Sequence, residues 1–336
     1  MLRRTLSIAA LAAAAMIVAM TAAGAEPVKI RAGWINVPAS LIPILFARPG
    51  LAKHEGVTYA FEPIYFSASG KQISAIATGD LDIAPLGFST VSIAILNAGL
   101  SDLRIIADET RDGVEGYNTV EYRVLRNGPV RTVADLKGKV LATNGYGAGV
   151  DIGMRAFLAR NNLIDKRDFT VIEAPFPTMR AILADRKADL VTATSPFKYD
   201  PEFEKMGRTL YTLRDALGVS ELSFWCVRES FLRNNRAALV DLLEDMIRAL
   251  RWYNDPANHR EAIEIVAKFT KQAPEVLDAW AFTHKDYYRD PDALVDLRAL
   301  QRNIQAQLDL GFIKSPIEIA NYADLSAVNE AAQRLR

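Results

Sequence analysis

The chain has 336 residues, of which 50% are hydrophobic and 24% are charged, and its 40 basic side chains equal its 40 acidic ones. This balance leaves no basic excess for binding nucleic acid or an anionic membrane surface, and the length favours two lobes over a single core. The single cysteine, Cys226, excludes an intramolecular disulfide and a cysteine-rich zinc site, and three well-separated histidines disfavour a histidine-based metal site.

The first 25 residues have the three parts of a secretory signal peptide. Arg3 and Arg4 form a cationic start, residues 6–20 are apolar except for a serine, and Ala23-Gly24-Ala25 is a small-x-small cleavage motif. The apolar part is shorter than the roughly 20 residues that span a bilayer, so cleavage after Ala25 is favoured over a membrane anchor. No cysteine near the motif could carry a lipid. We therefore expect a free protein in the periplasm.

From residue 28 onward, short β-rich runs alternate with helical patterns. The first series predicts strands at 28–35, 58–65, 82–86 and 103–107, with helices at 41–46, 70–78 and 89–97. The pattern then restarts, with strands at 140–143, 169–173 and 189–193 and helices at 133–138, 150–161 and 179–184. Such alternation predicts an α/β fold with a mainly parallel sheet of right-handed βαβ units in each of two lobes.

Two segments of the chain, 76–84 and 183–191, align without gaps. Each has the pattern of a helix end, a tight turn, an aspartate and a buried strand, with Asp82 and Asp189 in the same place. Because the match falls at the same point of both series, it supports two related lobes.

Two extended, aromatic-rich runs at 117–125 and 221–227 bracket the second series and are predicted to join the lobes. The last part of the chain is predicted to be helical, with a core-facing apolar stripe between 239 and 250. Further helices are predicted at 261–269, 273–281 and 293–308. The expected domains are a signal peptide (1–25), the first part of lobe 1 (26–115), lobe 2 (116–218), and the return strand and C-terminal helices of lobe 1 (219–336).

Small polar residues, glycines and aromatic residues recur directly after the predicted strands of both series. In open α/β sheets, ligands bind at this edge, next to helix N-termini whose free N–H groups favour anions. The expected ligand-binding residues are Trp34, Asn36, Ser40, Tyr65, Ser67, Ser69, Gly87, Phe88, Ser89, Asn144, Tyr146, Gly147, Phe176, Ser195 and Phe197. Taken singly, each serine also suits a helix N-cap and each aromatic residue suits core packing, so the prediction depends on the whole set. Together they predict a pocket for a ligand with a flat or apolar body.

Other chemistry is weakly represented in the sequence. The glycines at 145, 147 and 149 lack dinucleotide spacing, and no lysine follows them as in a phosphate-binding loop. No serine, histidine and aspartate form a recognisable catalytic set, and Cys226 lies in an apolar strand, so we expect no catalytic residue, metal or cofactor. Asp108, Glu109 and Arg111 are interpreted as surface charges near a hinge, with a ligand carboxylate on Arg111 as the alternative.

Several motifs in the sequence resemble those of a known family. The signal peptide, the run Ser69-Gly70 through Gly79-Asp80-Leu81-Asp82, and Asp135-Leu136-Lys137-Gly138-Lys139 resemble substrate-binding proteins of the nitrate/sulfonate/taurine type. That group includes binders of the thiamine pyrimidine precursor, and residues 183–196 resemble its second-lobe strand and loop. The resemblance implies a two-lobed periplasmic binding protein fold (type II) that grips a small molecule between its lobes. It also implies an inner-membrane ABC permease with its ATPase subunit as partner, and we expect a monomer.

Two features depart from that family. The turn at 184–189 lacks the usual glycine, and the aromatic loops exceed what a sulfate-like group alone requires. We therefore expect a small organic anion, preferably an aromatic carboxylate or sulfonate, bound by lobe closure. The alternatives are a thiamine pyrimidine precursor as ligand, a role as an extracytoplasmic ligand sensor, and an enzyme like the pyrimidine-precursor synthases. Those synthases use a critical histidine and a cysteine-rich motif, so we expect a binding protein and not an enzyme.

Overall fold

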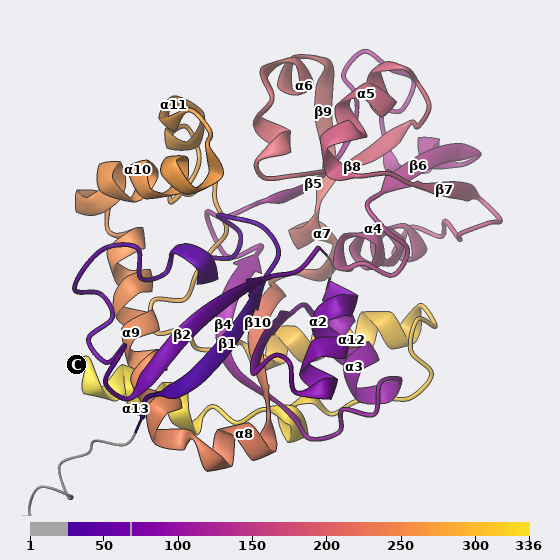
Figure 1. Ribbon diagram of the computed structural model, residues 1–336. Coiled ribbons are helices and arrows are strands. Elements are labelled where there is room, and N and C mark those ends of the chain that lie inside the picture. Colours follow the sequence, from indigo (N-terminus) through magenta and orange to yellow (C-terminus); the bar gives the residue numbers. More distant parts are fainter. Residues whose placement is uncertain (1–25, 68) are drawn as a thin grey trace, which may run out of the picture.

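Each predicted βαβ series forms one mixed sheet of five strands, and helices cover the faces of both sheets (Figure 1). The computed structural model describes residues 26–67 and 69–336, so the predicted signal peptide lies outside the described residues. Within these ranges no helix has the length and apolarity needed to cross a membrane. We call the sheet that contains the first strand, with its helices, lobe 1, and the other sheet, with its helices, lobe 2.

The sheet of lobe 1 has the order β2-β1-β3-β10-β4. Its strands are β1 (Val28–Trp34), β2 (Tyr59–Tyr65), β3 (Ile83–Leu86), β4 (Leu103–Asp112) and β10 (Ser220–Arg228). β1 pairs in parallel with β2 and β3, whereas β10 is antiparallel to both of its neighbours. The antiparallel strand is thus the one that comes back from lobe 2, and the sheet is otherwise parallel as predicted.

The sheet of lobe 2 repeats this arrangement in the order β7-β6-β8-β5-β9. Its strands are β5 (Val120–Leu125), β6 (Lys139–Thr143), β7 (Phe169–Glu173), β8 (Leu190–Thr194) and β9 (Gly207–Thr212). β5, the strand that enters from lobe 1, is again antiparallel to both neighbours. The two extended runs predicted to join the lobes are therefore β5 and β10. Individual domain boundaries remain a prediction.

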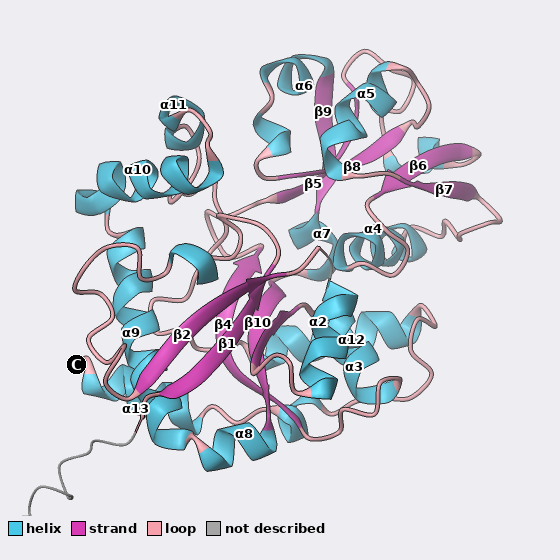
Figure 2. Cartoon of the chain, in the orientation of Figure 1, coloured by secondary structure: helices cyan, strands magenta, loops and turns pink. Residues whose placement is uncertain are grey.

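Helices flank both sheets (Figure 2). They are α2 (Ser69–Thr78), α3 (Phe88–Leu96), α4 (Gly149–Arg160), α5 (Met179–Ala184), α6 (Pro201–Met206), α7 (Leu213–Leu217), α8 (Glu229–Asn234), α9 (Arg236–Asn254), α10 (His259–Thr270), α11 (Pro274–Asp278), α12 (Leu297–Asp309) and α13 (Ser326–Arg334). The helices predicted at 41–46 and 133–138 are shorter 3-10 turns, at Ile42–Ile44 and Val133–Leu136. The segment with α6, β9 and α7 was not predicted.

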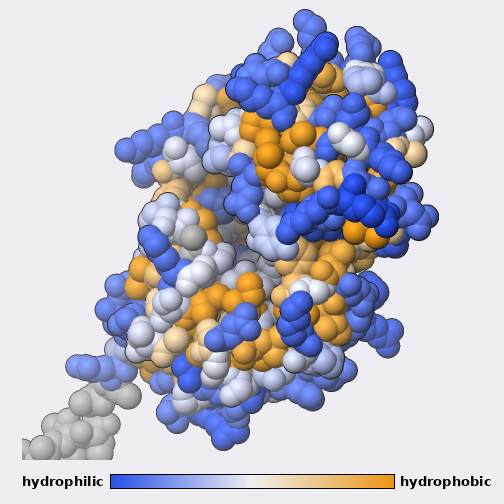
Figure 3. Space-filling view, turned by 90° about the vertical axis from the view of Figure 1, so that its right-hand side faces the viewer, coloured by the Kyte–Doolittle hydropathy of each residue, from blue (hydrophilic) through white to orange (hydrophobic). Residues whose placement is uncertain are grey.

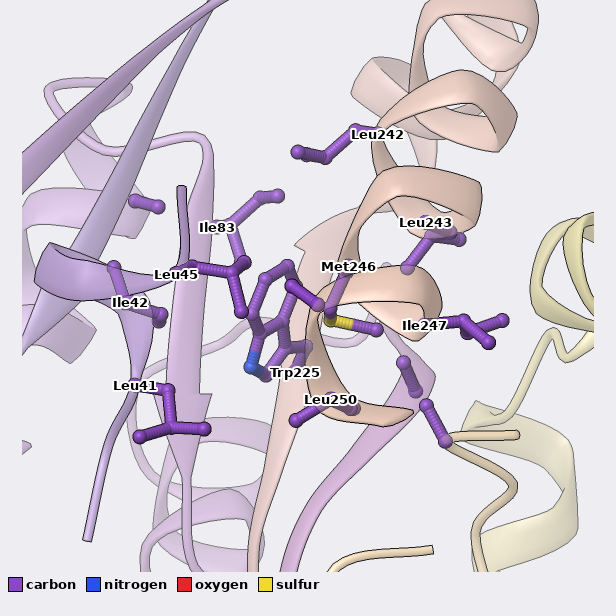
Figure 4. Packing of buried hydrophobic residues seen from close by; sticks show 14 of the residues in the cluster. Leu41, Ile42, Leu45, Ile83, Trp225, Leu242, Leu243, Met246, Ile247 and Leu250 are labelled. Atoms are coloured by element: carbon purple, nitrogen blue, oxygen red, sulfur yellow. The ribbon is translucent and has the colours of Figure 1, made fainter. Parts of the chain in front are cut away.

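The core of lobe 1 depends on the long helix α9. Its apolar side chains from Leu239 to Leu250 are 5% exposed or less and pack towards Trp225 of β10 and Ile83 of β3 (Figure 4). The 3–4 spacing read from the sequence is thus a core-facing stripe, as predicted. A second cluster lies between this sheet and α2, α3 and α12, and smaller clusters fill lobe 2.

The two aligned segments occupy equivalent places in the two sheets. The Asp82 carboxylate accepts a hydrogen bond from the backbone N–H of Arg31 (2.8 Å), and the Asp82 N–H donates to the Arg31 carbonyl (3.0 Å). In lobe 2 the Asp189 carboxylate accepts from the N–H of Val140 (3.1 Å), and its own N–H donates to the Val140 carbonyl (2.7 Å). Each aspartate therefore ties the start of the third strand of its series to the first strand.

Candidate ligand-binding site

A cavity of about 350 Å³ lies between the lobes, at the carboxyl ends of the parallel strands. In the space-filling view the molecule is hollowed between its two lobes, and hydrophobic surface borders the hollow on both sides (Figure 3). Ten of the predicted ligand-binding residues line this cavity: Asn36, Ser40, Ser69, Gly87, Phe88, Ser89, Asn144, Phe176, Ser195 and Phe197. Residues that follow strand ends in both lobes thus meet at one cavity, which is where open α/β sheets bind ligands.

Five predicted residues do not line the cavity: Trp34, Tyr65, Ser67, Tyr146 and Gly147. Trp34 packs against Tyr65 (ring centroids 4.9 Å apart) and against Phe269 of α10 (5.5 Å), away from the cavity. Ser67 is exposed. Tyr146 is 63% exposed and packs on Phe312 at 4.9 Å, and Gly147 lies against the same ring.

Several cavity residues were not predicted, above all Glu109 and Thr110 on β4, Ser223 on β10, and Tyr287. The strand prediction ended at 107, whereas β4 continues to Asp112 and carries Glu109 into the cavity wall. The interpretation of residues 108–111 as surface charges was wrong, since Asp108, Glu109 and Arg111 are all 8% exposed or less. A longer strand there would have pointed to Glu109, whereas Tyr287 lies in an irregular segment without a sequence signal.

Three helices begin at the cavity: α2 at Ser69, α3 directly after Gly87, and α4 directly after Ala148. Neither α3 nor α4 has a side-chain hydrogen bond at its N-cap. Ser89 lies inside the first turn of α3 and not at the cap. The N–H groups at the very start of α3 and α4 are therefore not used by a side-chain cap, and the helix dipoles favour an anionic acceptor there.

Aromatic and apolar groups form much of the remaining wall. Phe88 is 1% exposed and lies against the first turn of α4, so that a Cβ on Gly149 would be 2.9 Å from its ring. Phe176 and Phe197 come from lobe 2, and Tyr287 adds a hydroxyl whose pKa burial raises to about 12. Such a wall suits a flat or apolar ligand body with few polar ends.

The lobes touch on two sides of the cavity. On one side Tyr199 of lobe 2 donates a hydrogen bond to the Lys285 carbonyl (2.6 Å), and Tyr287 donates to the Ser195 carbonyl (3.3 Å). On the other side Tyr146 packs on Phe312. These contacts link the two lobes beside the cavity, so a ligand held there would lie between both lobes.

One acidic side chain, Glu109, lies in the cavity wall. Its Oε1 accepts a hydrogen bond from the Ser40 hydroxyl (2.6 Å), and its Oε2 accepts one from the Ser223 hydroxyl. Burial raises the pKa of Glu109, although both serine hydrogen bonds oppose that shift. The carboxyl group is thus fixed in orientation and poorly solvated.

Arg111 lies behind the cavity, where the chain crosses between the lobes. Its Nε is 2.8 Å from Glu221 Oε1 and 3.6 Å from Asp108 Oδ1, and its Nη1 is 3.7 Å from Asp290 Oδ2. Burial, with the neighbouring Asp108, raises the pKa of Glu221. Because Arg111 is shared among these carboxylates and does not line the cavity, the alternative of a ligand carboxylate on Arg111 has no support.

None of the three histidines lines the cavity. His54 lies elsewhere in lobe 1, where its Nδ1 is 3.1 Å from Asp245 Oδ1, and where it could share an ion with Asp241 and Glu244. Cys226 is fully buried, and burial raises the pKa of its thiol. Among the described residues that line the cavity, the polar groups therefore suit recognition better than nucleophilic catalysis.

Comparisons with known proteins give both a family and a fold. A sequence model of the NMT1-like family matches residues 23–267, whereas no curated protein sequence is a significant match. The chain is similar to the periplasmic aliphatic sulphonate binding protein SsuA from Escherichia coli, with a TM-score of 0.71 and 16% identity over 88% of this chain and 92% of that one. It is similar to the periplasmic nitrate-binding protein NrtA from Synechocystis PCC 6803, with a TM-score of 0.67 and 16% identity over 93% and 90%.

A third similar structure is the desulfurization enzyme DSZB, with a TM-score of 0.63 and 16% identity over 92% of this chain and all (100%) of that one. Likenesses at these identities establish the fold alone, and they confirm the predicted two-lobed α/β fold of periplasmic binding proteins. The family match covers more than half of the chain and agrees with the resemblance read from its motifs. The chain therefore belongs to the NMT1-like family.

Proposed function

We propose that this chain is the solute-binding component of an ABC importer and captures a small organic anion between its lobes. The observation that carries the proposal is the convergence of three helix N-termini on one cavity between two lobes. Helix starts without side-chain caps in α3 and α4 offer N–H donors and a favourable dipole to a carboxylate or sulfonate. The aromatic wall favours an aromatic body for that ligand.

The cellular setting is part of the proposal. A cleaved signal peptide would place the protein in the periplasm as a monomer, where the closed form would deliver its ligand to an inner-membrane permease with an ATPase subunit. Two similar structures carry names that fit such a role, a sulphonate binding protein and a nitrate-binding protein. The similar enzyme DSZB keeps catalysis in view, but no cysteine or histidine lines the described cavity here, so binding is the better-supported role.

Ligand capture would proceed by closure of the lobes. A ligand first bound at the ends of α2 and α3 in lobe 1 would gain contacts from α4, Phe176 and Phe197 in lobe 2. Only the closed arrangement provides both sets of contacts, so the ligand stabilises it in proportion to its extra affinity for that form.

A thermal-shift screen of the mature protein tests the function. The panel contains benzoate, benzenesulfonate, 4-substituted derivatives of both, nitrate and short alkanesulfonates. We expect aromatic acids to raise the melting temperature, because a ligand that binds only the folded state stabilises it, and to compact the protein in small-angle X-ray scattering. Stabilisation by nitrate or short alkanesulfonates alone would contradict an aromatic ligand. No stabilisation by any small molecule would contradict solute binding.

Two glycines provide a matched test of closure in the same screen. A Cβ on Gly149 would be 2.9 Å from Phe88 across the interface between the lobes, whereas a Cβ on Gly145 would meet nothing within 4 Å. We expect Gly149→Ala to weaken binding of the best aromatic acid about tenfold, a steric cost of about 1.4 kcal/mol in the closed form only. Gly145→Ala should bind as the wild type does. Equal affinities of the two variants would argue against closure at this interface.

A further inference from the structure

The charge balance of the cavity differs from that expected for a site that takes a simple anion. Among the described residues that line it, Glu109 is the one carboxylic acid, and no lysine, arginine or histidine is present. The helix starts favour negative charge at one part of the wall, whereas the Glu109 carboxylate repels it at another. A ligand that bears only an anionic group would leave Glu109 buried without a cationic partner.

Three of the neighbouring acids each have a cation. Asp108 and Glu221 lie beside Arg111, and Asp286 Oδ2 is 3.0 Å from Arg289 Nη1. Among the residues that the structure describes, Glu109 has no ion-pair partner within 4.0 Å, although it is only 8% exposed. Arg289, whose charge lowers the pKa of Glu109 against the larger effect of burial, directs its Nη1 to Asp286 and its Nη2 to the Pro38 carbonyl. A buried carboxylate without a cation is costly, so a partner supplied by the ligand would stabilise the complex.

Geometry favours that role over a purely structural one. The hydroxyls of Ser40 and Ser223 each occupy one acceptor position of the carboxylate, and both of these serines line the cavity with Glu109. Because each carboxylate oxygen can accept two hydrogen bonds, the carboxylate of this cavity-lining residue retains acceptor capacity. The serines therefore hold the carboxyl group in a fixed orientation, as a preorganised recognition group requires.

We propose that Glu109 is the specificity-determining residue of this site and binds a protonated amine of the ligand, so that the cavity takes an aromatic acid that also carries an amino group. The inference rests on the proposed solute-binding function and refines its ligand class. The ammonium group would donate a charge-assisted hydrogen bond to Glu109, and the carboxylate or sulfonate would lie at the helix starts.

Matched probes separate the amine from the rest of the ligand. The first pair is 4-(aminomethyl)benzoate and 4-ethylbenzoate, and the second is the corresponding pair of benzenesulfonates. Within each pair a methyl group replaces the ammonium group at nearly the same shape. Isothermal titration of the wild-type protein should show at least about tenfold tighter binding of the amine probe, as expected for one buried charge-assisted hydrogen bond.

The variant Glu109→Gln keeps the size of the side chain and removes its charge. We expect it to lose about tenfold or more in affinity for the amine probes and to bind the ethyl probes as well as or better than the wild type. Glu275→Gln is the control, because Glu275 is an exposed residue of α11 that does not line the cavity, and it should bind all four probes as the wild type does. Circular dichroism verifies that each variant is folded.

The wild-type comparison alone decides the inference if Glu109→Gln does not fold. Equal or tighter binding of the ethyl probes by the wild type would overturn the role of Glu109 and leave the proposed solute-binding function intact. An unchanged preference for the amine in Glu109→Gln would overturn it as well. Failure of all four probes and of the whole screening panel to bind would instead overturn the proposed function, and this inference with it.

Discussion

Lobes 1 and 2 share a strand order but stabilise their equivalent parts differently. In lobe 1, Asp82 accepts hydrogen bonds not only from the Arg31 N–H but also from the Arg31 guanidinium, at 2.8 Å to each carboxylate oxygen. In lobe 2, Asp189 holds only the backbone of Val140 closely, since Lys139 Nζ is 3.8 Å from its carboxylate. The shared backbone bond marks what the fold requires, and the close two-point ion pair with an arginine is an addition of lobe 1.

The two strands that cross between the lobes, β5 and β10, differ more sharply. On β5, the Glu121 carboxylate lies 2.7 Å from Lys198 Nζ and 2.9 Å from Arg123 Nε. On β10, Glu221 shares the single Arg111 with Asp108 and Asp290. Burial alone would raise the pKa of both glutamates, but the two cations hold the pKa of Glu121 below its usual range, whereas the pKa of Glu221 is raised. Glu121 thus has two cations to itself, whereas Glu221 is one of three carboxylates around a single cation, and this difference accounts for the opposite directions of the two pKa shifts.

Replacing each of these glutamates with glutamine is expected to have the largest effect on stability. Glu121→Gln would leave Lys198 buried with less compensation and should lower the free energy of unfolding by about 3 kcal/mol at pH 7. The pKa of Glu121 is lower in the folded state than in the unfolded state. Its contribution to the free energy of unfolding is therefore present above the unfolded-state pKa and is lost as pH falls through the folded-state pKa. The difference between wild type and Glu121→Gln should therefore shrink in acid.

Glu221→Gln is the counterpart with the opposite sign. Since the folded pKa of Glu221 is raised, its stabilising contribution is present at low pH and is lost as pH rises through the folded pKa. The glutamine variant should therefore match the wild type near pH 4 and gain on it as pH rises. Urea titrations from pH 4 to pH 8 measure both variants. Parallel pH profiles for the two would show that the crossing strands do not differ in this way.

The aspartates of the repeated turns are expected to differ by a smaller amount. Asp82→Ala removes three hydrogen bonds that Arg31 donates, two of them from its charged guanidinium. It should lower the free energy of unfolding by about 2 kcal/mol once the surrounding residues relax, and by about 3 kcal/mol at most. Asp189→Ala removes one close backbone bond and should cost about 1 kcal/mol. Urea unfolding followed by tryptophan fluorescence and circular dichroism measures both. Equal losses would mean that the Arg31 ion pair adds nothing to the shared turn.

Regular elements with local signals were predictable from the sequence. β7 and α5 begin and end where the apolar spacing placed them, and the repeated aspartates located the third strand of each series. β9 was missed because its six residues alternate weakly and follow a short helix. The site was predictable where strand ends carry small polar residues. Glu109 was not predictable, because a run of charged residues indicates a surface segment. Its burial follows from contacts with Ser40 and Ser223, which are distant in sequence.

The smallest expected effect on stability concerns the tight turn that precedes each aspartate. The two lobes place different residues at the left-handed position of this turn. Gly79 in lobe 1 has φ of +79°, and Arg186 at the equivalent place in lobe 2 has φ of +57°. A left-handed backbone costs a residue with a Cβ roughly 1–2 kcal/mol. Glycine avoids this cost, but the greater conformational entropy of its unfolded chain removes roughly 0.4–1 kcal/mol of the advantage. Arg186 is exposed, so its side chain meets no further constraint.

The two substitutions should therefore have opposite signs. Gly79→Ala should lower the free energy of unfolding by about 1 kcal/mol, although a Cβ there meets nothing within 4 Å. Arg186→Gly should raise it by about 0.5 kcal/mol, because the strain is removed and part of the gain is lost to chain entropy. Gly70, whose backbone is helical and whose Cβ position is open, is the control, since Gly70→Ala should stabilise α2 by helix propensity. A stabilising Gly79→Ala would show that the two turns, despite their shared aspartate, do not share a backbone requirement.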